Sequence, residues 1–484
     1  MRGRRTIGGL AAAIFGLCLA AGASAQNAAW SPDPWLADLA EMRAAFDEKY
    51  ANLEWLTGER EVDLAALFER AAARIRAAHD DAGARSAFDR LVRRIGDGHV
   101  EISWPIPSGG SASAPAPAAT GAAALCRRLG YDAAQNSPGI GPSLAGYRPV
   151  DREGMFATGI VAVGGARVGI IRIPVFQPQA DPNLCEGAIS ALAINPDLPC
   201  DDGCADRIIT WAYERMTGDF EERLRRLRSA GADVLMVDIG GNGGGSEWAE
   251  AAARSVSPVP LTSERRAFVR GAHWARQWRD LGALLRERAS SADPADRARL
   301  LGWAADADAA LRQAEPCPRG ADCARLGRAG YMTGLVGAAP AGAFDGRDWA
   351  VHVFSPAQFP YHDHVWTGPL IVLVDQETWS AAEEFAAVLQ DNRAAIILGA
   401  RSGGAGCGHT NGGTPTRLRN SGATLRLPDC VRLRADGSNE VRGIIPDELV
   451  GLRADDGSRF RAGLITAALG RAVAQARALH RGAD

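Results

Sequence analysis

The sequence predicts an α/β protein that is preceded by a small bundle of helices. Four short, continuous apolar runs are typical of strands buried on both faces, at residues 168–173, 234–239, 370–374 and 395–398. Helical stretches follow the second and third runs, and this alternation favours a parallel sheet covered by helices. Ahead of them, apolar residues recur at helical spacing between about residues 33 and 95.

The first residues predict a cleavable signal peptide over residues 1–25. Three arginines precede an apolar run at 7–21, and small residues at 23–25 form a cleavage site. We favour an ordinary secretory signal over a twin-arginine signal. No later run reaches the roughly 18 apolar residues that span a bilayer. We therefore expect a periplasmic or secreted protein without a membrane span.

The cysteines agree with export. Nine are present, and removing Cys18 with the signal peptide leaves eight, an even number that favours disulfides in an exported chain. Proximity along the chain predicts the pairs Cys317–Cys323 and Cys407–Cys430. The spacing of Cys200 and Cys204 would also suit zinc, but no second ligand pair accompanies them, so neither a metal nor a cofactor is expected.

The charge balance argues against a nucleic acid as the main partner, and the near absence of lysine restricts the catalytic mechanism. Lysine and arginine total 54 against 57 acidic residues, so there is no basic excess to neutralise the phosphates of a nucleic acid. Lys49 is the one lysine, and the other 53 basic residues are arginines. A catalytic lysine would therefore have to be Lys49.

Composition predicts three regions after the signal peptide. Residues 26–104 form an N-terminal helical domain, and residues 105–160, which begin with a stretch rich in Pro, Ser, Gly and Ala, form a linker or loop-rich region. Residues 161–470 form the α/β core. A long insertion at about 250–368 is helical and rich in Arg and Ala in its first half, and the sequence leaves open whether it covers a site.

Ser380 lies where a predicted strand meets a predicted helix. A serine at such a turn projects its hydroxyl from the end of the sheet, and the amides of the helix start can bind developing negative charge. The alternative is that Ser380 caps the helix and Glu383 completes a capping box. A GxSxG nucleophile elbow is absent, because Thr378 and Ala382 occupy the glycine positions.

Three further segments carry polar or glycine-rich patterns. Residues 238–245 contain five glycines after a strand; they lack the Lys-Ser/Thr ending of a phosphate loop, which leaves an oxyanion hole or a tight turn. His99 follows the helical region in an Asp-Gly-His sequence. Residues 439–447 read as a polar turn before a strand. His362 and His364 could suggest a metal site, but without a third ligand a polar loop is favoured.

Taken in order, these segments resemble the C-terminal-processing and tricorn-core family of serine peptidases. The resemblance implies a spiral β/α peptidase core, similar to the crotonase and Clp peptidase folds, behind the N-terminal helical bundle. It covers roughly half of the mature chain. The segments that carry it are 97–99, 238–245, 380–386, 399–404 and 440–447.

The resemblance also implies roles for individual residues. The processing branch has a lysine base about 25 residues after the serine, and the matching residue here is Ala405, which excludes a Ser–Lys dyad. The tricorn-like branch instead implies Ser380 as nucleophile, His99 as general base and Glu440 as the acid that orients the imidazole.

The remaining members of the site stay open in part. The implied oxyanion donors are the backbone amides of Ala381 and of either Gly243 or Gly244. His409, four residues after Ala405, is the alternative base. The tricorn-like pattern has a serine before the histidine, and this chain has Gly98 there; Asp97 or a water could replace the missing link.

We therefore expect an exported serine peptidase that hydrolyses peptides or unfolded proteins through a serine nucleophile and a histidine base. A non-catalytic ligand-binding protein on the same fold is the first alternative, and a hydrolase of small esters or amides is the second. The presence of Ser380, of two candidate bases and of the glycine-rich segment favours catalysis.

Overall fold

The structure is a computed structural model that describes residues 30–105, 120–317, 322–453 and 455–482. The expected signal peptide, and the Pro- and Ser-rich start of the expected linker from residue 106 on, lie outside the described residues. No helix in the described ranges combines the length and the apolar character needed to cross a membrane.

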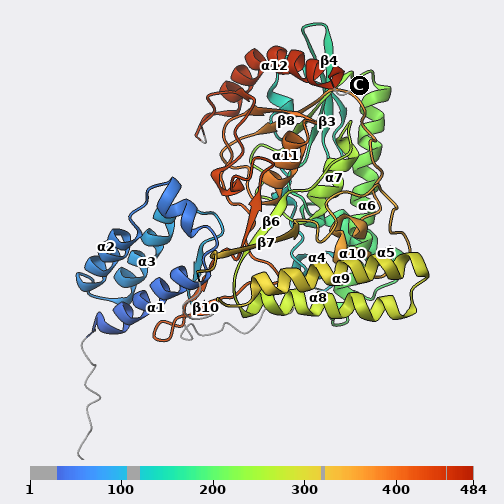
Figure 1. Ribbon diagram of the computed structural model, residues 1–484. Coiled ribbons are helices and arrows are strands. Elements are labelled where there is room, and N and C mark those ends of the chain that lie inside the picture. Colours follow the sequence, from blue (N-terminus) through green and yellow to red (C-terminus); the bar gives the residue numbers. More distant parts are fainter. Residues whose placement is uncertain (1–29, 106–119, 318–321, 454, 483–484) are drawn as a thin grey trace, which may run out of the picture.

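Helices and strands alternate along most of the chain (Figure 1). The α-helices are α1 (Asp33–Lys49), α2 (Leu64–Arg76), α3 (Asp81–Ile95), α4 (Ala122–Arg128), α5 (Pro182–Ala191), α6 (Asp202–Ser229), α7 (Trp248–Val256), α8 (Ala272–Ser291), α9 (Pro294–Ala314), α10 (Ala350–Val353), α11 (Ala381–Asp391) and α12 (Ser458–Arg481). The strands are β1 (Glu101–Ser103), β2 (Arg148–Asp151), β3 (Thr158–Val163), β4 (Ala166–Arg172), β5 (Val234–Asp238), β6 (Arg265–Val269), β7 (Leu326–Tyr331), β8 (Leu370–Val374), β9 (Ile396–Gly399), β10 (Thr416–Arg417), β11 (Thr424–Arg426), β12 (Cys430–Leu433) and β13 (Glu448–Leu449).

The main sheet has the strand order β13-β9-β8-β5-β4-β3-β2. Its central strands β4, β5, β8 and β9 are parallel neighbours, and each matches one of the four apolar runs that the sequence predicts as strands. At one edge, β2 and β3 continue the sheet in the antiparallel sense. The predicted α/β class is thereby confirmed.

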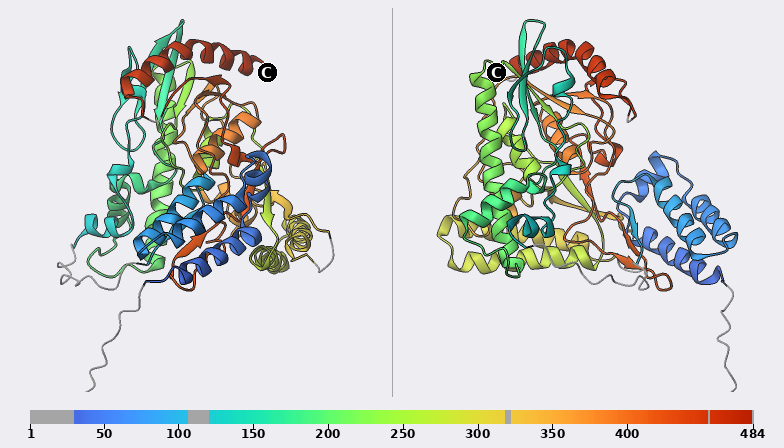
Figure 2. Two further views of the ribbon diagram at one scale, coloured as in Figure 1. Left: turned by 90° about the vertical axis from the view of Figure 1, so that its left-hand side faces the viewer. Right: turned by 180° about the vertical axis from the view of Figure 1, so that it is seen from behind.

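Helices cover both faces of this sheet (Figures 1 and 2). Successive residues of a strand point to opposite faces, so Leu235 and Val237 pack in the core that contains α6, α7 and α11. Val234 and Met236 pack in a second core beneath α12. Burial on both faces explains why these strands are apolar without alternation.

The N-terminal helices form a separate lobe beside the core (Figure 2). Helices α1, α2 and α3 share a hydrophobic core with the three-stranded sheet β1-β11-β10. Its buried members include Phe46 and Phe88 from the helices and Leu425 from β11. A segment near the C-terminus of the chain thus completes the lobe, and this pairing brings the end of α3 to the core.

The structure adds detail to the expected regions, whose boundaries remain predictions. Within 105–160, residues from 120 on include α4 and β2, and β3 begins at Thr158, ahead of the expected start of the core. In the insertion, α8 and α9 pack as a helical hairpin, as Figure 1 shows. Its strands β6 and β7 form a sheet with β12.

Four disulfides link all eight cysteines outside the expected signal peptide. The two predicted pairs, Cys317–Cys323 and Cys407–Cys430, are confirmed. Cys126 joins Cys185, and Cys200 joins Cys204, so the latter two thiols are not zinc ligands. The Cys407–Cys430 bridge ties the loop after β9 to β12.

Candidate active site

Ser380 occupies a strained turn between β8 and α11. Its φ angle is +57°, which is rare for a residue with a side chain and is found where surrounding contacts enforce it. Its backbone N–H donates to the Glu383 carboxylate over 3.0 Å, the backbone half of the predicted capping box. The helix start that the sequence predicts is thus present, with Ser380 held at its tip.

A cavity of about 330 Å³ opens in front of Ser380. It brings the serine and the first residue of α11 together with both candidate bases, of which His99 is far from them in sequence. Its lining residues are His99, Gly245, Ser246, Glu247, Arg266, Met332, Ser380, Ala381, Glu384, Cys407, His409, Thr410, Asn411 and Arg432.

His99 is held by hydrogen bonds on both its backbone and its ring. Its N–H donates to the Asp97 carboxylate over 3.0 Å, and that buried carboxylate also accepts from Tyr50 and Asn52 at 2.9 and 2.8 Å. Burial raises the pKa of Asp97. Nδ1 of His99 lies 2.8 Å from the carbonyl oxygen of Ala405, which can only accept, so Nδ1 carries the proton and Nε2 keeps a free lone pair.

The predicted contact between Glu440 and His99 is not made. The Glu440 carboxylate is buried and accepts from the Arg432 guanidinium over 2.8 Å, while the Ala405 carbonyl is the partner of the imidazole. Arg432 also lies 3.2 Å from the Glu384 carboxylate and donates to the carbonyl oxygen of Ser380 over 2.9 Å. A buried cation needs such counter-charges, and this requirement decides where Glu440 points.

Glu383 connects the serine turn to the segment that holds His99. Besides the Ser380 amide, its carboxylate accepts from the hydroxyl of Ser402 and from the amides of Gly404 and Ala405, over 2.5, 2.7 and 2.8 Å. Burial, and then the charge of Glu440, raise the pKa of this carboxyl to about 7. One side chain therefore fixes both Ser380 and Ala405, the residue whose carbonyl orients the imidazole.

In the glycine-rich turn, the residue that lines the cavity is Gly245, whereas the sequence predicts Gly243 or Gly244 as the oxyanion donor. The N–H of Gly244 donates to the Asn242 side chain over 2.8 Å, so it is already engaged, and Gly243 is not among the cavity-lining residues. Gly245 does line the cavity, as does Ala381. Neither of their amides has a hydrogen-bond acceptor within the described ranges.

Trp379 explains why glycine stands before the histidine. A Cβ added to Gly98 would lie 2.1 Å from the indole ring of Trp379, and one added to Gly403 would lie 2.5 Å from the same ring. The indole therefore fills the space that a serine at position 98 would need. Asp97 binds the backbone of His99, and so it does not replace that serine on the ring.

His409 is placed in the cavity but is a weak base. Burial, and next the charge of His99, lower the pKa of the His409 imidazole to about 4. Its Nε2 is buried and finds no hydrogen-bond partner in the part of the chain that the structure describes. The two imidazole rings are 5.9 Å apart, centre to centre.

Other candidate groups lie elsewhere. The ammonium of Lys49 donates to Thr416 in β10 and is absent from the cavity lining. His362 pairs with the Glu221 carboxylate over 2.8 Å, and His364 hydrogen-bonds the carbonyl of Ser257. Throughout the described ranges, no three side chains of the metal-binding types converge on one point.

Two residues of the site escape the sequence analysis. The sequence predicts Glu383 only as a capping residue. A glutamate three residues after a candidate nucleophile also indicates a carboxylate that can hold the backbone of that nucleophile. Arg432 lies among apolar residues of β12, and an isolated arginine in a buried strand indicates a buried counter-charge.

Comparison with known proteins adds an independent line of argument. The model of peptidase family S41 matches residues 167–450. No curated protein matches the chain by sequence. Among solved structures, mature CPAF has the same fold, with a TM-score of 0.58 and 15% identity over 92% of this chain and 98% of that one. Mature CPAF complexed with lactacystin gives a TM-score of 0.59 and 15% identity over 92% and 99% of the two chains.

Proposed function

Since this chain belongs to peptidase family S41 and is a serine-type peptidase, we propose that Ser380 is its nucleophile and His99 its general base. The observation that carries the proposal is the shared cavity, in which Nδ1 of His99 is bound to the Ala405 carbonyl and Nε2 stays free. A serine hydroxyl needs such a base to take its proton.

The reaction follows from these positions. The Ser380 hydroxyl attacks the carbonyl carbon of the scissile peptide bond while Nε2 of His99 accepts its proton. The resulting imidazolium returns the proton to the leaving amine, and an acyl-enzyme remains. Water then attacks the ester, again with His99 as base, and releases the second product and free Ser380.

We assign the oxyanion hole to the amides of Ala381 and Gly245. Both residues line the cavity, and Ala381 is the first residue of α11, where the helix dipole favours negative charge. Gly244 supports the hole by its size. A Cβ at this position would lie 2.8 Å from the Cβ of Ser380 and push the nucleophile aside.

Glu383 acts as a positioning residue in this mechanism. Its ionised form can accept all four hydrogen bonds, two of which hold Ser380 and Ala405 in place and two of which come from Ser402 and Gly404. Arg432, which is paired with Glu384 and Glu440, also holds Ser380 by donating a hydrogen bond to the carbonyl oxygen of Ser380. The nucleophile is thus oriented by its own backbone.

We propose that the substrates are peptides or unfolded proteins. A second cavity of about 430 Å³ adjoins the site and shares Glu247, Arg266 and Met332 with it. Trp274 and Trp278 of α8 also line it. The two cavities together are longer than a small ester needs. They could hold an extended peptide that runs from Ser380 along the insertion. The polar lining around Ser380 does not favour the ligand-binding alternative.

The proposal includes export from the cytoplasm. Four disulfides agree with an oxidising compartment, because such bonds are rare where thiols are kept reduced. The N-terminal signal read from the sequence is the second argument.

Digestion of a permanently unfolded, dye-labelled protein tests the function. We expect the oxidised wild type to release labelled peptides and Ser380→Ala to release none. Ser190→Ala, on the exposed end of α5, is the matched control and should cleave like the wild type. Cleavage by folded Ser380→Ala at the wild-type rate would refute the assignment of the nucleophile.

A further inference from the structure

A groove in the N-terminal lobe gathers positive charge away from the candidate active site. It lies between α2 and α3 and has a volume of about 810 Å³. Five of the residues that line the groove are arginines, and Asp63 is the one acidic residue in the lining. The arginines are Arg70 and Arg74 on α2 and Arg90, Arg93 and Arg94 on α3.

These arginines lack anionic partners. No carboxylate of the described residues forms an ion pair with any of the five, and only Arg90 has a recorded side-chain partner, the Ser86 hydroxyl at 3.3 Å. The Asp63 carboxylate caps α2 by accepting from the Ala66 amide. Five guanidinium groups therefore remain able to bind a ligand.

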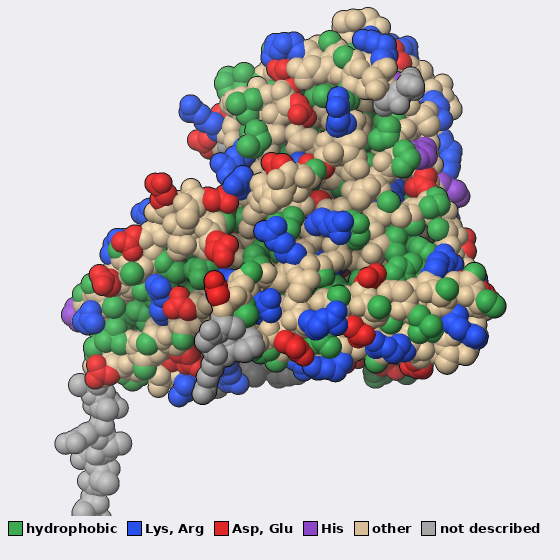
Figure 3. All heavy atoms as spheres, viewed as in Figure 1, with side chains coloured by type: hydrophobic (Ala, Val, Ile, Leu, Met, Phe, Trp, Pro, Cys, Tyr) green, Lys and Arg blue, Asp and Glu red, His purple; other side chains and the backbone are tan. Residues whose placement is uncertain are grey.

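The arrangement works against the stability of the lobe. Arg70 and Arg74 are four residues apart on one helix, as are Arg90 and Arg94 on the other, and like charges at this spacing repel. Acidic and basic side chains mix over the face drawn in Figure 3, and the whole chain has 54 basic against 57 acidic residues, so the excess of arginine in the groove is local. A bound anion would relieve the repulsion.

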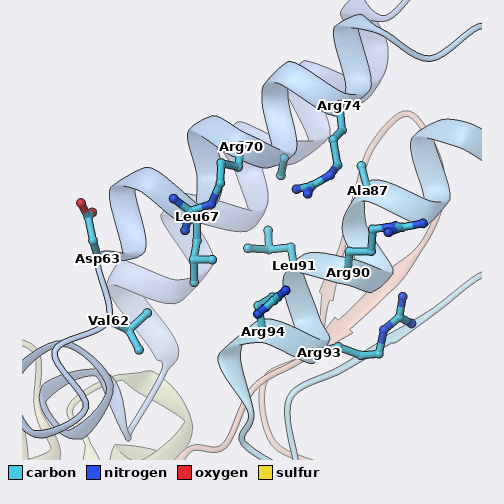
Figure 4. A pocket seen from close by; sticks show the side chains of 11 residues that line it. Val62, Asp63, Leu67, Arg70, Arg74, Ala87, Arg90, Leu91, Arg93 and Arg94 are labelled. Carbon is cyan, nitrogen blue, oxygen red and sulfur yellow. The ribbon is translucent and has the colours of Figure 1, made fainter.

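The floor of the groove is apolar. Leu67 and Ala71 of α2 and Ala87 and Leu91 of α3 line it and are buried. Figure 4 shows Leu67 and Leu91 in the space between the helices, with arginine side chains around them. A ligand that fits should therefore combine anionic groups for the rim with small apolar groups for the floor.

We propose that this groove binds an acidic polypeptide segment in extended conformation, with carboxylates at alternate residues. Arginines one helical turn apart are separated by about 6 Å along the helix. Alternate residues of an extended chain are about 7 Å apart and point to one side, while the residues between them point to the other. Guanidinium groups bind carboxylates through two parallel hydrogen bonds. This proposal does not depend on the function assigned to Ser380.

Fluorescence anisotropy tests the proposal with the oxidised full-length protein. The probe is a labelled peptide with Glu at alternate positions and Ala or Leu between them, and its partner has Gln in place of Glu. We expect the Glu peptide to bind, added salt to weaken it, and the Gln peptide to bind at least about tenfold more weakly.

Matched variants locate the binding site. Arg74→Gln/Arg94→Gln removes one cation from each wall and should weaken binding of the Glu peptide about tenfold. Arg76→Gln/Arg481→Gln removes the same charge from exposed positions outside the groove and should change binding less than about twofold. Thermal unfolding of both variants at or above the wild-type temperature would show that the lobe remains folded.

The other outcomes overturn the proposal. Equal binding of the Glu and Gln peptides, or equal losses in the two double variants, would mean that the groove is not the site. Inorganic phosphate, or vesicles of equal parts phosphatidylserine and phosphatidylcholine, could bind with the same arginine dependence while the peptide does not. The groove would then bind a phosphate or a membrane surface, and the peptide assignment would be wrong.

Discussion

Arginine plays opposite parts in the candidate active site and in the groove of the N-terminal lobe. At the candidate active site, Arg432 is buried and bound to two carboxylates and the carbonyl of Ser380. In the groove between α2 and α3, five arginines are exposed and have no carboxylate partner in the described ranges. The first arrangement fixes a position, whereas the second leaves charges free for a ligand.

This difference shows which arginines of the chain indicate a function. Some of its arginines form ordinary surface pairs, such as Arg43 with Asp47, which contribute little to stability. The informative arginines are those that are buried with several anions or gathered without any. Substitutions in the candidate active site and in the groove should therefore differ in what they change.

Replacing the base should have the largest effect. We expect His99→Ala to lower kcat by about 10⁴-fold, because the serine hydroxyl then loses its proton acceptor. Steady-state hydrolysis of a peptide substrate measures this. His362→Ala, which alters a histidine outside the cavity, is the control. A greater loss from His409→Ala than from His99→Ala would move the role of base to His409.

Removing the buried cation should have the next largest effect, on stability. Arg432→Leu leaves Glu384 and Glu440 buried without their partner, and breaking such a buried pair costs about 3–5 kcal/mol. Urea unfolding gives this value directly. Arg74→Gln, from the groove, should stay within about 0.5 kcal/mol of the wild type. Similar losses in both variants would remove the contrast between the candidate active site and the groove.

Glu383 should give the stability of the protein a pH dependence. Its pKa is about 7 in the folded protein, above the ordinary value of 4.5, so the folded state binds the proton more tightly than the unfolded state. The free energy of unfolding therefore falls as pH rises from about 4.5 to about 7. Glu383→Gln should flatten this fall by up to about 3 kcal/mol. Parallel curves for the two proteins, from denaturant titrations across this range, would contradict the prediction.

Neutralising the groove should have the smallest effect on stability, and in the opposite direction. Arg70→Gln removes a like-charge pair from α2 and should raise the free energy of unfolding by about 0.2–0.5 kcal/mol at low salt. High salt should cancel the gain. A loss of stability at low salt would show that Arg70 has a structural partner instead.

Local signals in the sequence predict much of the fold. The run at residues 370–374 coincides with β8, and α11 begins directly after Ser380. Both could be predicted because a buried strand and a helix start are each indicated by residues that are neighbours in the sequence. Proximity along the chain predicts two of the three disulfides between near neighbours, and the third, Cys200–Cys204, was not predicted although its cysteines are only four residues apart. Cys126–Cys185 joins α4 to α5 across 59 residues, and proximity along the chain gives no signal for it.

The contacts within the site depend on tertiary structure, and there the sequence analysis is incomplete. It brings His99 to Ser380 through a resemblance, but it assigns Glu440 to the imidazole. That carboxylate instead pairs with Arg432, whose burial depends on the sheet of β6, β7 and β12. Likewise, the engagement of the Gly244 amide by Asn242 follows from the folded shape of the turn.

Labelling with a fluorophosphonate probe tests the central claim most directly, because such probes react with serines that a base activates. The oxidised wild type should be labelled on Ser380, and Ser380→Ala, shown to be folded by circular dichroism, should not be labelled. Absence of label from folded wild type, or equal labelling of Ser380→Ala, would contradict the assignment of Ser380 as the nucleophile.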